Sequence, residues 1–512
     1  MELILKPGTS WVDAYRRCVE LAPEAFHQDR VLNLWGGQWH RDGVVAPATS
    51  PVDGSPIAGP PLLDLPQARE AVAAALTEHR TWREVPLAER QRRVTAAVDA
   101  MDQHRELLAL LLVWEIGKPW KTALNDVDRC LEGVRWYVEE IDRMLDGRTP
   151  LAGPVSNIAS WNYPMSVLMH AMLVQALAGN AVVAKTPTDG GLACLTLACA
   201  LAAREGIPFT LISGSGSRLA PTLVAGEEVG CVFFVGGRGA GNQVERLLES
   251  GKRYVLEQEG LNCWGVWEFS DWQMLAGHIR KGFDYAKQRC TAYPRYVVQR
   301  SLFDKFLATY LPVVEELRFG HPLAVEAADD ELPELDFGPL INAAKVKELR
   351  NDLDEAVVRG GVPIYRAPLD RGRFLPGQDT SAYCAPAAVL SPPQSSTLFH
   401  AEPFGPVDTI VLVDTEAELL AEMNASTGAL VASIACDDEP TAQRLGRELQ
   451  AFKVGINKPR SRGDRDEHFG GKGASWRGAF VGGALLVRAV TDGEPGDYLH
   501  GNFSTYSLYP ER

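Results

Sequence analysis

The sequence has no hydrophobic run long enough to cross a membrane. Its longest apolar stretch, Leu192–Ala203, is interrupted only by Thr196 and has 12 residues, whereas a membrane-spanning helix needs about 20. The first residues, from Met1 to Cys18, contain no apolar segment of signal-peptide length. We therefore expect a cytoplasmic protein without a membrane span, in which the apolar stretch forms a buried helix.

Basic charge and paired cysteines are also scarce. The formal net charge is −15 and no long run of Lys and Arg occurs, which argues against nucleic acid and against an anionic membrane surface as partners. The nine cysteines are odd in number, and neither a Cys-x-x-Cys pair nor a His-Glu-x-x-His motif is present. We therefore expect reduced thiols and no bound metal.

The pattern along the chain indicates an α/β protein. The 512 residues are 46% hydrophobic and 23% charged, which is typical of a folded chain with two or three domains. Residues 30–63 are rich in Gly, Pro and Trp and predict short strands and turns, and Asp64 is a suitable cap for the helical pattern that follows. Apolar strands then alternate with helices in 155–235 and again in 254–454. This alternation predicts parallel sheets, which bind ligands at the carboxyl ends of their strands.

One thiol, Cys290, stands in an unusual local sequence. It is followed by Thr291 and Ala292, a setting that suits a cysteine on a tight turn at the base of a pocket. A thiolate at such a place can attack a carbonyl carbon. Most lone cysteines are instead small buried hydrophobes, so both interpretations stay open on this segment alone.

Glycine-rich turns follow two of the predicted strands. Gly236–Gly241 comes after the apolar segment 231–235, and Gly214-Ser215-Gly216 comes after 209–212. Glycine lets the backbone approach a phosphate closely, and a helix that begins there adds amide donors. The spacing is not Gly-x-Gly-x-x-Gly, and glycine turns after strands are common, so a purely structural turn is the alternative.

Several segments, in order, resemble motifs of the aldehyde dehydrogenase superfamily. They are 159–164 (Pro-Trp-Asn-x-Pro in the family), 179–185 (Gly-Asn-x-Val-Val-x-Lys), 234–237 (Phe-Thr-Gly-Ser), 256–260 (Leu-Glu-Leu-Gly-Gly), 287–295 (Gly-Gln-x-Cys-Thr-Ala-x-x-Arg) and 402–407 (Glu-x-Phe-Gly-Pro-Val). The resemblance spans almost the whole chain. It implies an aldehyde dehydrogenase-like α/β fold with a Rossmann-type NAD(P)-binding domain (1–136 and 152–256), an α/β catalytic domain (257–454) and an oligomerisation or bridging segment (137–151 and 482–512).

The resemblance also implies a set of catalytic residues. Cys290 would attack an aldehyde, and its backbone N–H together with the Asn162 amide would stabilise the resulting oxyanion. Loss of hydride would leave a thioester on Cys290, and Glu257 would activate the water that releases the acid. Gln258 and Glu259 depart from the family pattern, and Glu259 is a second carboxylate that could serve in place of Glu257.

For the cofactor, the resemblance implies NADP or NAD bound at the carboxyl ends of the first set of strands. The implied contacts are Ala159, Ser160, Trp161, Lys185, Thr188, Gly216, Gly236, Gly237, Glu402 and Phe404. Many relatives that prefer NAD carry Glu at the position of Thr188, so we expect NADP to be accepted, with NAD as its rival. Gly237 replaces a serine, so one hydroxyl contact to phosphate is lost.

The substrate is less visible in the sequence. Arg289 beside the nucleophile, His170, and Arg460 in the basic loop 458–462 favour a small polar or acidic aldehyde, although solvated arginines and a core histidine are the alternatives. Two other functions stay open: an acylating enzyme that passes the acyl group to coenzyme A or phosphate, and a catalytically silent scaffold. The family implies a homodimer or homotetramer.

Overall fold

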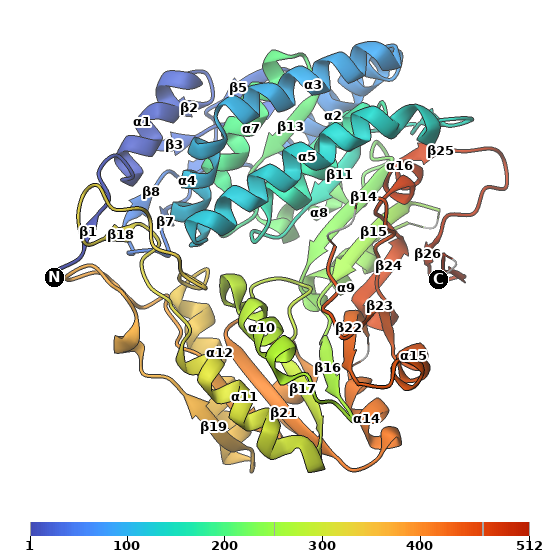
Figure 1. Cartoon of the computed structure of the whole chain (residues 1–512). Coiled ribbons are helices and arrows are strands. Elements are labelled where there is room, and N and C mark those ends of the chain that lie inside the picture. The colour runs from blue at the N-terminus through green and yellow to red at the C-terminus, as the bar shows by residue number, and fades with distance from the viewer. Residues whose placement is uncertain (1, 250, 427, 463–464, 511–512) are drawn as a thin grey trace.

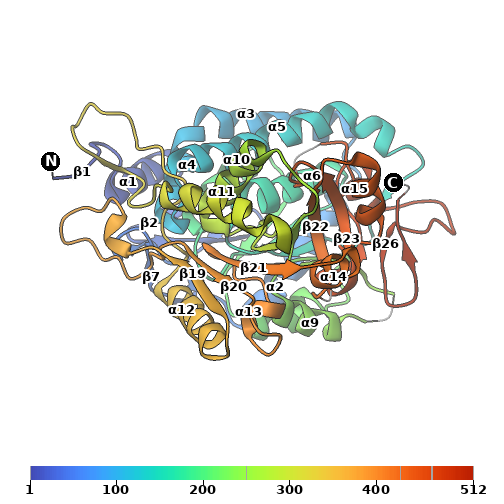
Figure 2. The same ribbon diagram turned by 60° about the horizontal axis from the view of Figure 1, so that its bottom comes forward.

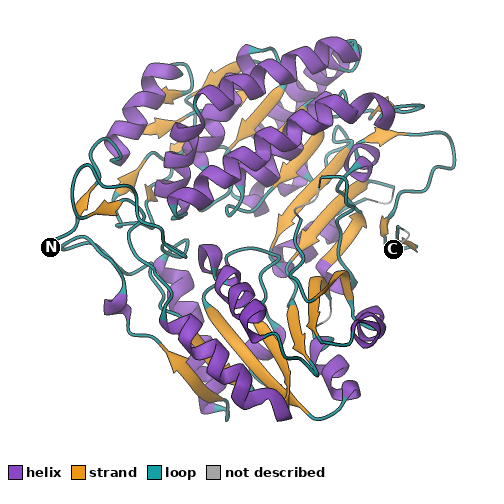
Figure 3. Ribbon diagram, in the orientation of Figure 1, coloured by secondary structure: helices purple, strands orange, loops and turns teal. Residues whose placement is uncertain are grey.

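Two β-sheets with helices on both faces organise the chain (Figure 1). The computed structural model describes all residues except 1, 250, 427, 463–464 and 511–512. The first sheet lies among the N-terminal helices, and the second is formed by the later part of the chain. Figure 3 shows the strands of both sheets enclosed by helices.

The first sheet has parallel strands at its centre. Strands β11 to β15 pair in parallel, and β4 and β24 add antiparallel strands on either side. Across the sheet the order is β27 (Ser507–Leu508), β26 (Gly501–Asn502), β24 (Trp476–Ala479), β15 (Arg253–Gln258), β14 (Cys231–Gly236), β11 (Val155–Ile158), β12 (Val182–Lys185), β13 (Phe209–Ile212), β4 (Asn33–Trp35) and β5 (Gln38–His40).

The second sheet is parallel except at one edge, where β19 pairs antiparallel with β20. Its order is β19 (Val362–Arg366), β20 (Ala387–Leu390), β21 (Val407–Val413), β17 (Arg295–Gln299), β16 (Cys263–Val266), β22 (Ala429–Ala435) and β23 (Ala451–Ile456). Short two-stranded pairs complete the strand set: β1 (Ile4–Leu5) with β18 (Ala324–Val325), β2 (Phe26–His27) with β3 (Arg30–Val31), β6 (Val44–Val45) with β9 (Pro61–Leu62), β7 (Ala48–Thr49) with β8 (Pro56–Ile57), and β10 (Thr149–Pro150) with β25 (Thr491–Asp492).

The helices bury their apolar faces against these sheets. Around the first sheet are α1 (Trp11–Leu21), α2 (Leu65–Trp82), α3 (Leu87–Gln103), α4 (Arg105–Ile116), α5 (Trp120–Met144), α6 (His170–Leu177), α7 (Leu192–Arg204), α8 (Gly216–Leu223), α9 (Arg238–Leu247) and α16 (Ala484–Ala489). Around the second are α10 (Trp272–Gly282), α11 (Phe303–Glu315), α12 (Ala343–Val358), α13 (Thr397–His400), α14 (Glu416–Met423) and α15 (Glu439–Arg447). Figure 2 shows α10 and α11 on one face of the second sheet and α12 and α13 on the other.

Local sequence signals explain several element boundaries. Asp64 caps α2 in a capping box with Gln67, which satisfies orphan amides at the start of the helix. Gly117 ends α4 with a φ of 71°, a conformation that glycine adopts without a steric penalty. The apolar stretch that begins at Leu192 is the buried helix α7. In the described part of the chain, no helix is both long and apolar enough to span a bilayer.

The segments assigned to oligomerisation are partly built into the first domain. Residues 137–144 are the last turns of α5. Strand β10 pairs antiparallel with β25, which belongs to the C-terminal segment. Strands β26 and β27 extend the first sheet beyond β24. A role of 137–151 and 482–512 in oligomerisation therefore stays a prediction. Within the chain, β26 and β27 form one edge of the first sheet.

The two sheets meet where β15 ends. Glu257 is the next-to-last residue of β15, and residues 259–262 lead directly into β16 of the second sheet. The carboxyl ends of parallel strands are the ligand-binding edge of such a sheet. Glu257 therefore lies at the ligand-binding edge of the first sheet, close to where the chain enters the second sheet.

Helix α7 begins without a side-chain cap of its own. Its cap position is Gly191, with a φ of 74°, so a buried residue of α4 takes over this function. The Glu115 carboxylate accepts hydrogen bonds from the backbone N–H of Ala193 at 2.7 Å and of Cys194 at 3.1 Å. A carboxylate at a helix N-terminus accepts hydrogen bonds from amides that have no partner within the helix, and its negative charge interacts favourably with the helix dipole.

We expect Glu115→Ala to lower the free energy of unfolding by about 2 kcal/mol, because two buried amides lose their acceptor. Glu115→Gln should give an intermediate loss, since its amide oxygen replaces one acceptor. Urea denaturation followed by tryptophan fluorescence measures both effects. Glu106→Ala, at an exposed position of the same helix, is the matched control, and an equal loss in Glu106→Ala would contradict this role of Glu115.

Candidate active site

The turn that carries Cys290 has a strained backbone. It lies between α10 and β17, and Tyr285, Ala286 and Lys287 have φ values of 58°, 53° and 58°. Left-handed backbone at non-glycine residues costs about 1–3 kcal/mol each and persists only where surrounding contacts hold it. The Tyr285 hydroxyl donates to the Ile116 carbonyl at 3.0 Å, and the Gln288 side-chain oxygen accepts from the Ile341 N–H at 3.0 Å. Such strain is typical of functional turns.

Asn262 fixes the same turn from the other side, and our sequence interpretation missed it. Its side-chain amide donates to the carbonyls of Cys290 and Ala292, each at 2.8 Å. Its side-chain oxygen accepts from the N–H of Leu430 and of Val431. Asn262 therefore connects the cysteine turn to β22. The available signal was a single polar residue between the segment 256–260 and an apolar strand.

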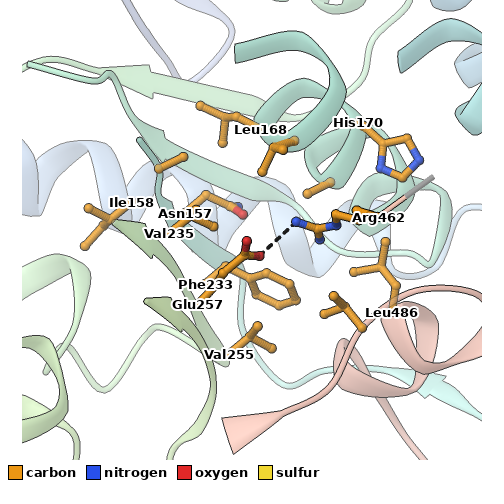
Figure 4. A pocket seen from close by; sticks show the side chains of 14 residues that line it. Asn157, Ile158, Leu168, His170, Phe233, Val235, Val255, Glu257, Arg462 and Leu486 are labelled. Carbon is orange, nitrogen blue, oxygen red and sulfur yellow. Dashed lines mark hydrogen bonds and ion pairs between the residues drawn. The ribbon is translucent and has the colours of Figure 1, made fainter. Parts of the chain in front are cut away.

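Glu257 lies between the thiol of Cys290 and a guanidinium group. The Cys290 Sγ donates to Glu257 Oε1 at 3.1 Å, and Arg462 Nη1 is 2.9 Å from Glu257 Oε2. Figure 4 shows this contact between Arg462 and the almost fully buried Glu257. Burial raises the pKa of Cys290 well above the ordinary thiol range, the Glu257 carboxylate raises it further, and Arg462 opposes the rise. The resting group is therefore a thiol with an acceptor for its proton already in place.

Asn162 approaches the cysteine turn from the first domain. Its side-chain amide donates to the Gln288 carbonyl at 3.0 Å, two residues before the nucleophile candidate. Asn162 precedes a wide π-helical turn, Pro164–Met169, that runs into α6. An amide N–H at this place can stabilise negative charge that develops beside Cys290.

Glu257 also lines a small cavity, to which Cys290 does not contribute. It has a volume of about 30 Å³, enough for one or two water molecules. Ten of its lining residues are labelled in Figure 4, and they include Glu257, Arg462, His170, Leu168, Phe233 and Leu486. Burial, with a smaller effect of Arg462, lowers the pKa of His170 to about 3. His170 is therefore a neutral imidazole, packed edge to face on Tyr137 with ring centres 5.5 Å apart.

Apart from Glu402 and Phe404, which lie in the loop before β21, the predicted cofactor residues lie at the carboxyl ends of β11, β12, β13 and β14, or just beyond them. Lys185 is the last residue of β12, and a Cβ on Gly216 would lie 3.7 Å from Lys185 Cε, so the two positions are neighbours. Burial lowers the pKa of Lys185 to about 8. Thr188 is exposed. Ala159 also lines the cavity beside Glu257, and Ser160 and Trp161 follow it toward Asn162.

A contact between the rings of Trp161 and Phe404 joins the second domain to the carboxyl edge of the first sheet. Their centres are 5.9 Å apart at an interplanar angle of 88°, so the segment 402–404 faces the end of β11. Burial, and next the charge of Glu259, raise the pKa of Glu402 well above the ordinary carboxyl range. Among the described residues, Glu402 Oε1 is buried without a hydrogen-bond partner. A buried acceptor left open in this way fits a ligand that supplies a hydroxyl donor.

The glycine turn offers the complementary donors. Gly237 caps α9 without a side-chain contact, so the first amides of this helix face the carboxyl edge of the sheet and suit a phosphate. Arg238 and Glu259 lie beside it, with Nε and Oε1 4.0 Å apart. Together with the open acceptor on Glu402, these residues fit a dinucleotide.

Arg289 and Arg460 are not among the residues lining the cavity beside Glu257. Arg289 donates to the carbonyls of Lys281 and Gly282 at the end of α10. Arg460 forms contacts of 2.6 and 2.8 Å with the Glu467 carboxylate. Arg462, two residues further along the same loop, is the arginine that reaches the cavity. In the described residues, no group of three His, Cys, Asp or Glu side chains could hold a metal ion.

Comparisons with known proteins agree with this arrangement. Residues 39–491 match the family model described as "Aldehyde dehydrogenase family". The chain is 26% identical to 3,6-anhydro-alpha-L-galactose dehydrogenase of Vibrio sp. (strain EJY3), over 85% of this chain and 89% of that protein. It is 25% identical to the mitochondrial succinate-semialdehyde dehydrogenase of Oryza sativa subsp. japonica, over 84% and 82%.

A solved structure gives the same result. The NADP complex of NADP-dependent glyceraldehyde-3-phosphate dehydrogenase from Bacillus halodurans C-125 has a TM-score of 0.81 at 26% identity, and the match covers 91% of this chain and 98% of that one. The match to the family model covers well over half of the chain, and the motifs it contains converge at the junction of the two sheets. The chain therefore belongs to the aldehyde dehydrogenase family.

Proposed function

We propose that this NAD(P)-dependent aldehyde dehydrogenase oxidises a small polar or acidic aldehyde to its carboxylate, through a thiohemiacetal and a thioester on Cys290. The observation that carries the proposal is the 3.1 Å contact between the Cys290 thiol and the Glu257 carboxylate. It joins a nucleophile and a base at the meeting point of the two sheets.

The first half of the reaction uses the groups that surround Cys290. Glu257 accepts the thiol proton, and the thiolate attacks the aldehyde carbon. The Asn162 side-chain amide and the Cys290 backbone N–H donate to the oxyanion, once Asn162 turns from its contact with the Gln288 carbonyl. Loss of hydride would then leave the thioester, and bound NAD or NADP would supply the hydride acceptor. Lys185, Gly216, Gly236, Gly237, Glu402 and Phe404 would hold that cofactor.

The second half of the reaction needs an activated water. After Glu257 has released the thiol proton to solvent, its carboxylate can deprotonate a water that moves to the thioester from the adjoining cavity, which has room for one or two waters. Glu259 lies toward Arg238 and influences Glu402, which supports Glu257 as the base. A base that lies between the thioester and a water site favours hydrolysis over transfer of the acyl group to coenzyme A or phosphate. The same functional groups speak against a silent scaffold.

Arg462 supports a substrate that carries a polar or anionic group. Its guanidinium reaches the cavity beside Glu257, stacked over Phe469 at 5.0 Å. Relatives include enzymes named for succinate semialdehyde and for glyceraldehyde 3-phosphate, two anionic aldehydes. A carboxylate or phosphate on the substrate would pair with Arg462 and release Glu257 to act as a base. Neutral His170 adds a hydrogen-bonding group without charge.

The remaining features of the proposal are cofactor choice, assembly and location. Thr188 is uncharged at the position where many relatives that prefer NAD carry Glu, which supports use of NADP as well as NAD. We propose a homodimer or homotetramer in the cytoplasm, without nucleic acid or membrane as partners. The net charge of −15 supports the last point.

Cys290→Ala should reduce NAD(P)H formation by at least about 1,000-fold, because no other group can form the thioester. The measurement is absorbance of the reduced nicotinamide over a panel of acidic, neutral polar and apolar aldehydes with both cofactors. Cys384→Ala, a buried thiol in the second domain, is the control and should retain activity. Unchanged turnover in Cys290→Ala, or faster turnover of long apolar aldehydes by the native protein, would refute the proposal.

Arg462→Gln should raise KM for acidic aldehydes by about 10- to 100-fold, which is the contribution expected of a charge-assisted hydrogen bond. KM for neutral aldehydes of similar size should change much less. Steady-state kinetics on matched acidic and neutral aldehydes separate the two effects. Arg465→Gln, an exposed position of the same loop, is the control. An equal rise for both classes would contradict a role of Arg462 in recognising anions.

Cofactor binding should weaken as the pH rises above about 8, because burial has lowered the pKa of Lys185 to about 8 and the neutral amine attracts phosphate less. We expect the dissociation constant of NADP to rise about tenfold between pH 7 and pH 9.5, measured by quenching of tryptophan fluorescence. Lys185→Met should bind more weakly at pH 7 and lose this dependence. If Lys185→Met keeps the native pH profile, Lys185 is not the group responsible.

A further inference from the structure

A buried lysine lies three residues before Cys290. Lys287 Nζ is 2.7 Å from Asp408 Oδ1, and the two side chains are 1% and 0% exposed. Replacing such a buried ion pair by apolar residues is often neutral or stabilising, because desolvation offsets the attraction between the charges. A contribution to folding stability therefore does not by itself explain why this ion pair lies so close to Cys290.

The lysine connects both sides of the cysteine turn. Lys287 belongs to the segment before Cys290, and its Nζ donates at 3.0 Å to the carbonyl of Tyr293, which follows Cys290. The same ammonium lies 4.2 Å from the centre of the Phe283 ring. Asp408 is fixed in turn, because its Oδ2 accepts from the Tyr310 hydroxyl at 2.9 Å. The side chain thus forms a cross-link beneath the turn.

The backbone of Lys287 makes the choice of a lysine unexpected. Its φ is 58°, a conformation that an L-residue adopts at a cost of about 1–3 kcal/mol. The family segment that 287–295 resembles has glycine here, which carries no such cost. The side-chain contacts of Lys287 must therefore offset a backbone penalty that glycine would avoid.

Asp408 connects the turn to the cofactor side of the cleft. It is the second residue of β21 and follows the segment 402–406, which carries Glu402 and Phe404. Strand β21 also pairs in parallel with β17, the strand that follows Cys290, and Thr409 is opposite Arg295. The ion pair thus joins the segment before the nucleophile to the strand that follows Glu402 and Phe404.

We propose that Lys287 and Asp408 are positioning residues, which fix the Cys290 turn relative to the segment that carries Glu402 and Phe404. The proposal rests on the assignment of Cys290 as nucleophile. Neither residue contacts the thiol or Glu257 in any described interaction, and the ammonium is neutralised by its partner. The pair therefore acts by holding the turn in place, and a small displacement of the thiol lowers the rate of attack strongly.

The test replaces the pair by apolar residues of similar size, in Lys287→Met/Asp408→Leu. We expect a folded protein with a kcat lower by about 10- to 100-fold, since misplacement by about 1 Å has effects of this size. The rate of alkylation of Cys290 by iodoacetamide, and the change in that rate when NADP binds, should both differ from the native protein. Alkylation needs no turnover, so it tests this proposal even if the proposed oxidation fails.

A second double variant separates positioning from backbone strain. Lys287→Gly/Asp408→Leu removes the side-chain cross-link and also the penalty of the positive φ. We expect the same loss of kcat and the same altered alkylation. Native kcat and native alkylation in this variant would overturn the proposal, because the lysine would then only compensate for its own backbone conformation.

Two further variants keep the test decisive. Asp408→Asn retains the shape of the acceptor, so it serves if the apolar variants do not fold, and it should lower kcat by about tenfold. Arg300→Gln/Asp414→Asn removes an exposed ion pair at the other end of the same strands and should leave kcat and alkylation unchanged. Native kcat and alkylation in a folded Asp408→Asn protein, or equal effects in the exposed pair, would contradict the proposal.

Discussion

The contact between the Cys290 thiol and the Glu257 carboxylate is the interaction on which the rest of the site depends. The two residues are 33 positions apart. Glu257 is on β15 of the first sheet and Cys290 is in the turn before β17 of the second sheet, so the contact depends on how the two sheets meet. It also has two opposing effects on the thiol proton. Burial and the carboxylate raise the pKa of the thiol, and the same carboxylate provides the route by which the proton leaves. Arg462 contacts the other oxygen of Glu257 at 2.9 Å and orients that carboxylate.

Holding this contact requires irregular backbone in a buried place. Three successive left-handed residues precede Cys290, and strained functional turns need contacts that over-determine them. The structure supplies such contacts from several directions. Asn262 binds the carbonyls after the strained residues, Gln288 binds the neighbouring loop, and Lys287 reaches across the turn to Tyr293 while pairing with Asp408. The opposite wall is formed from the first domain, where Asn162 donates to the turn. Rigid sheets carry the reacting groups, and side-chain contacts fix the segment between them.

Local signals predicted much of this fold. The capping residue Asp64 and the apolar segment from Leu192 each act within a few residues, and the structure confirms the helices they indicate. The motifs also predicted which parts of the chain gather at the junction of the sheets. The sequence could not show which arginine of the basic loop faces the cavity, because Arg460 and Arg462 differ only in the direction of their side chains. It also could not show Asn262 or the pairing of Lys287 with Asp408, since these contacts join residues that are distant along the chain.

The most direct test of the central claim is to trap the acyl group on the thiol. Glu257→Gln keeps the shape of the side chain and removes the base. The Cys290 thiol can then lose its proton only to solvent, so the thioester forms more slowly, but no base remains to activate the water that removes it. The account therefore predicts that the thioester accumulates over time when aldehyde and cofactor are both present. Mass spectrometry of acid-quenched, digested protein should find the acyl mass on the peptide that contains Cys290, in an amount close to one per chain. Turnover of the same aldehyde with no adduct on that peptide in Glu257→Gln, or an adduct on another cysteine, would contradict the account.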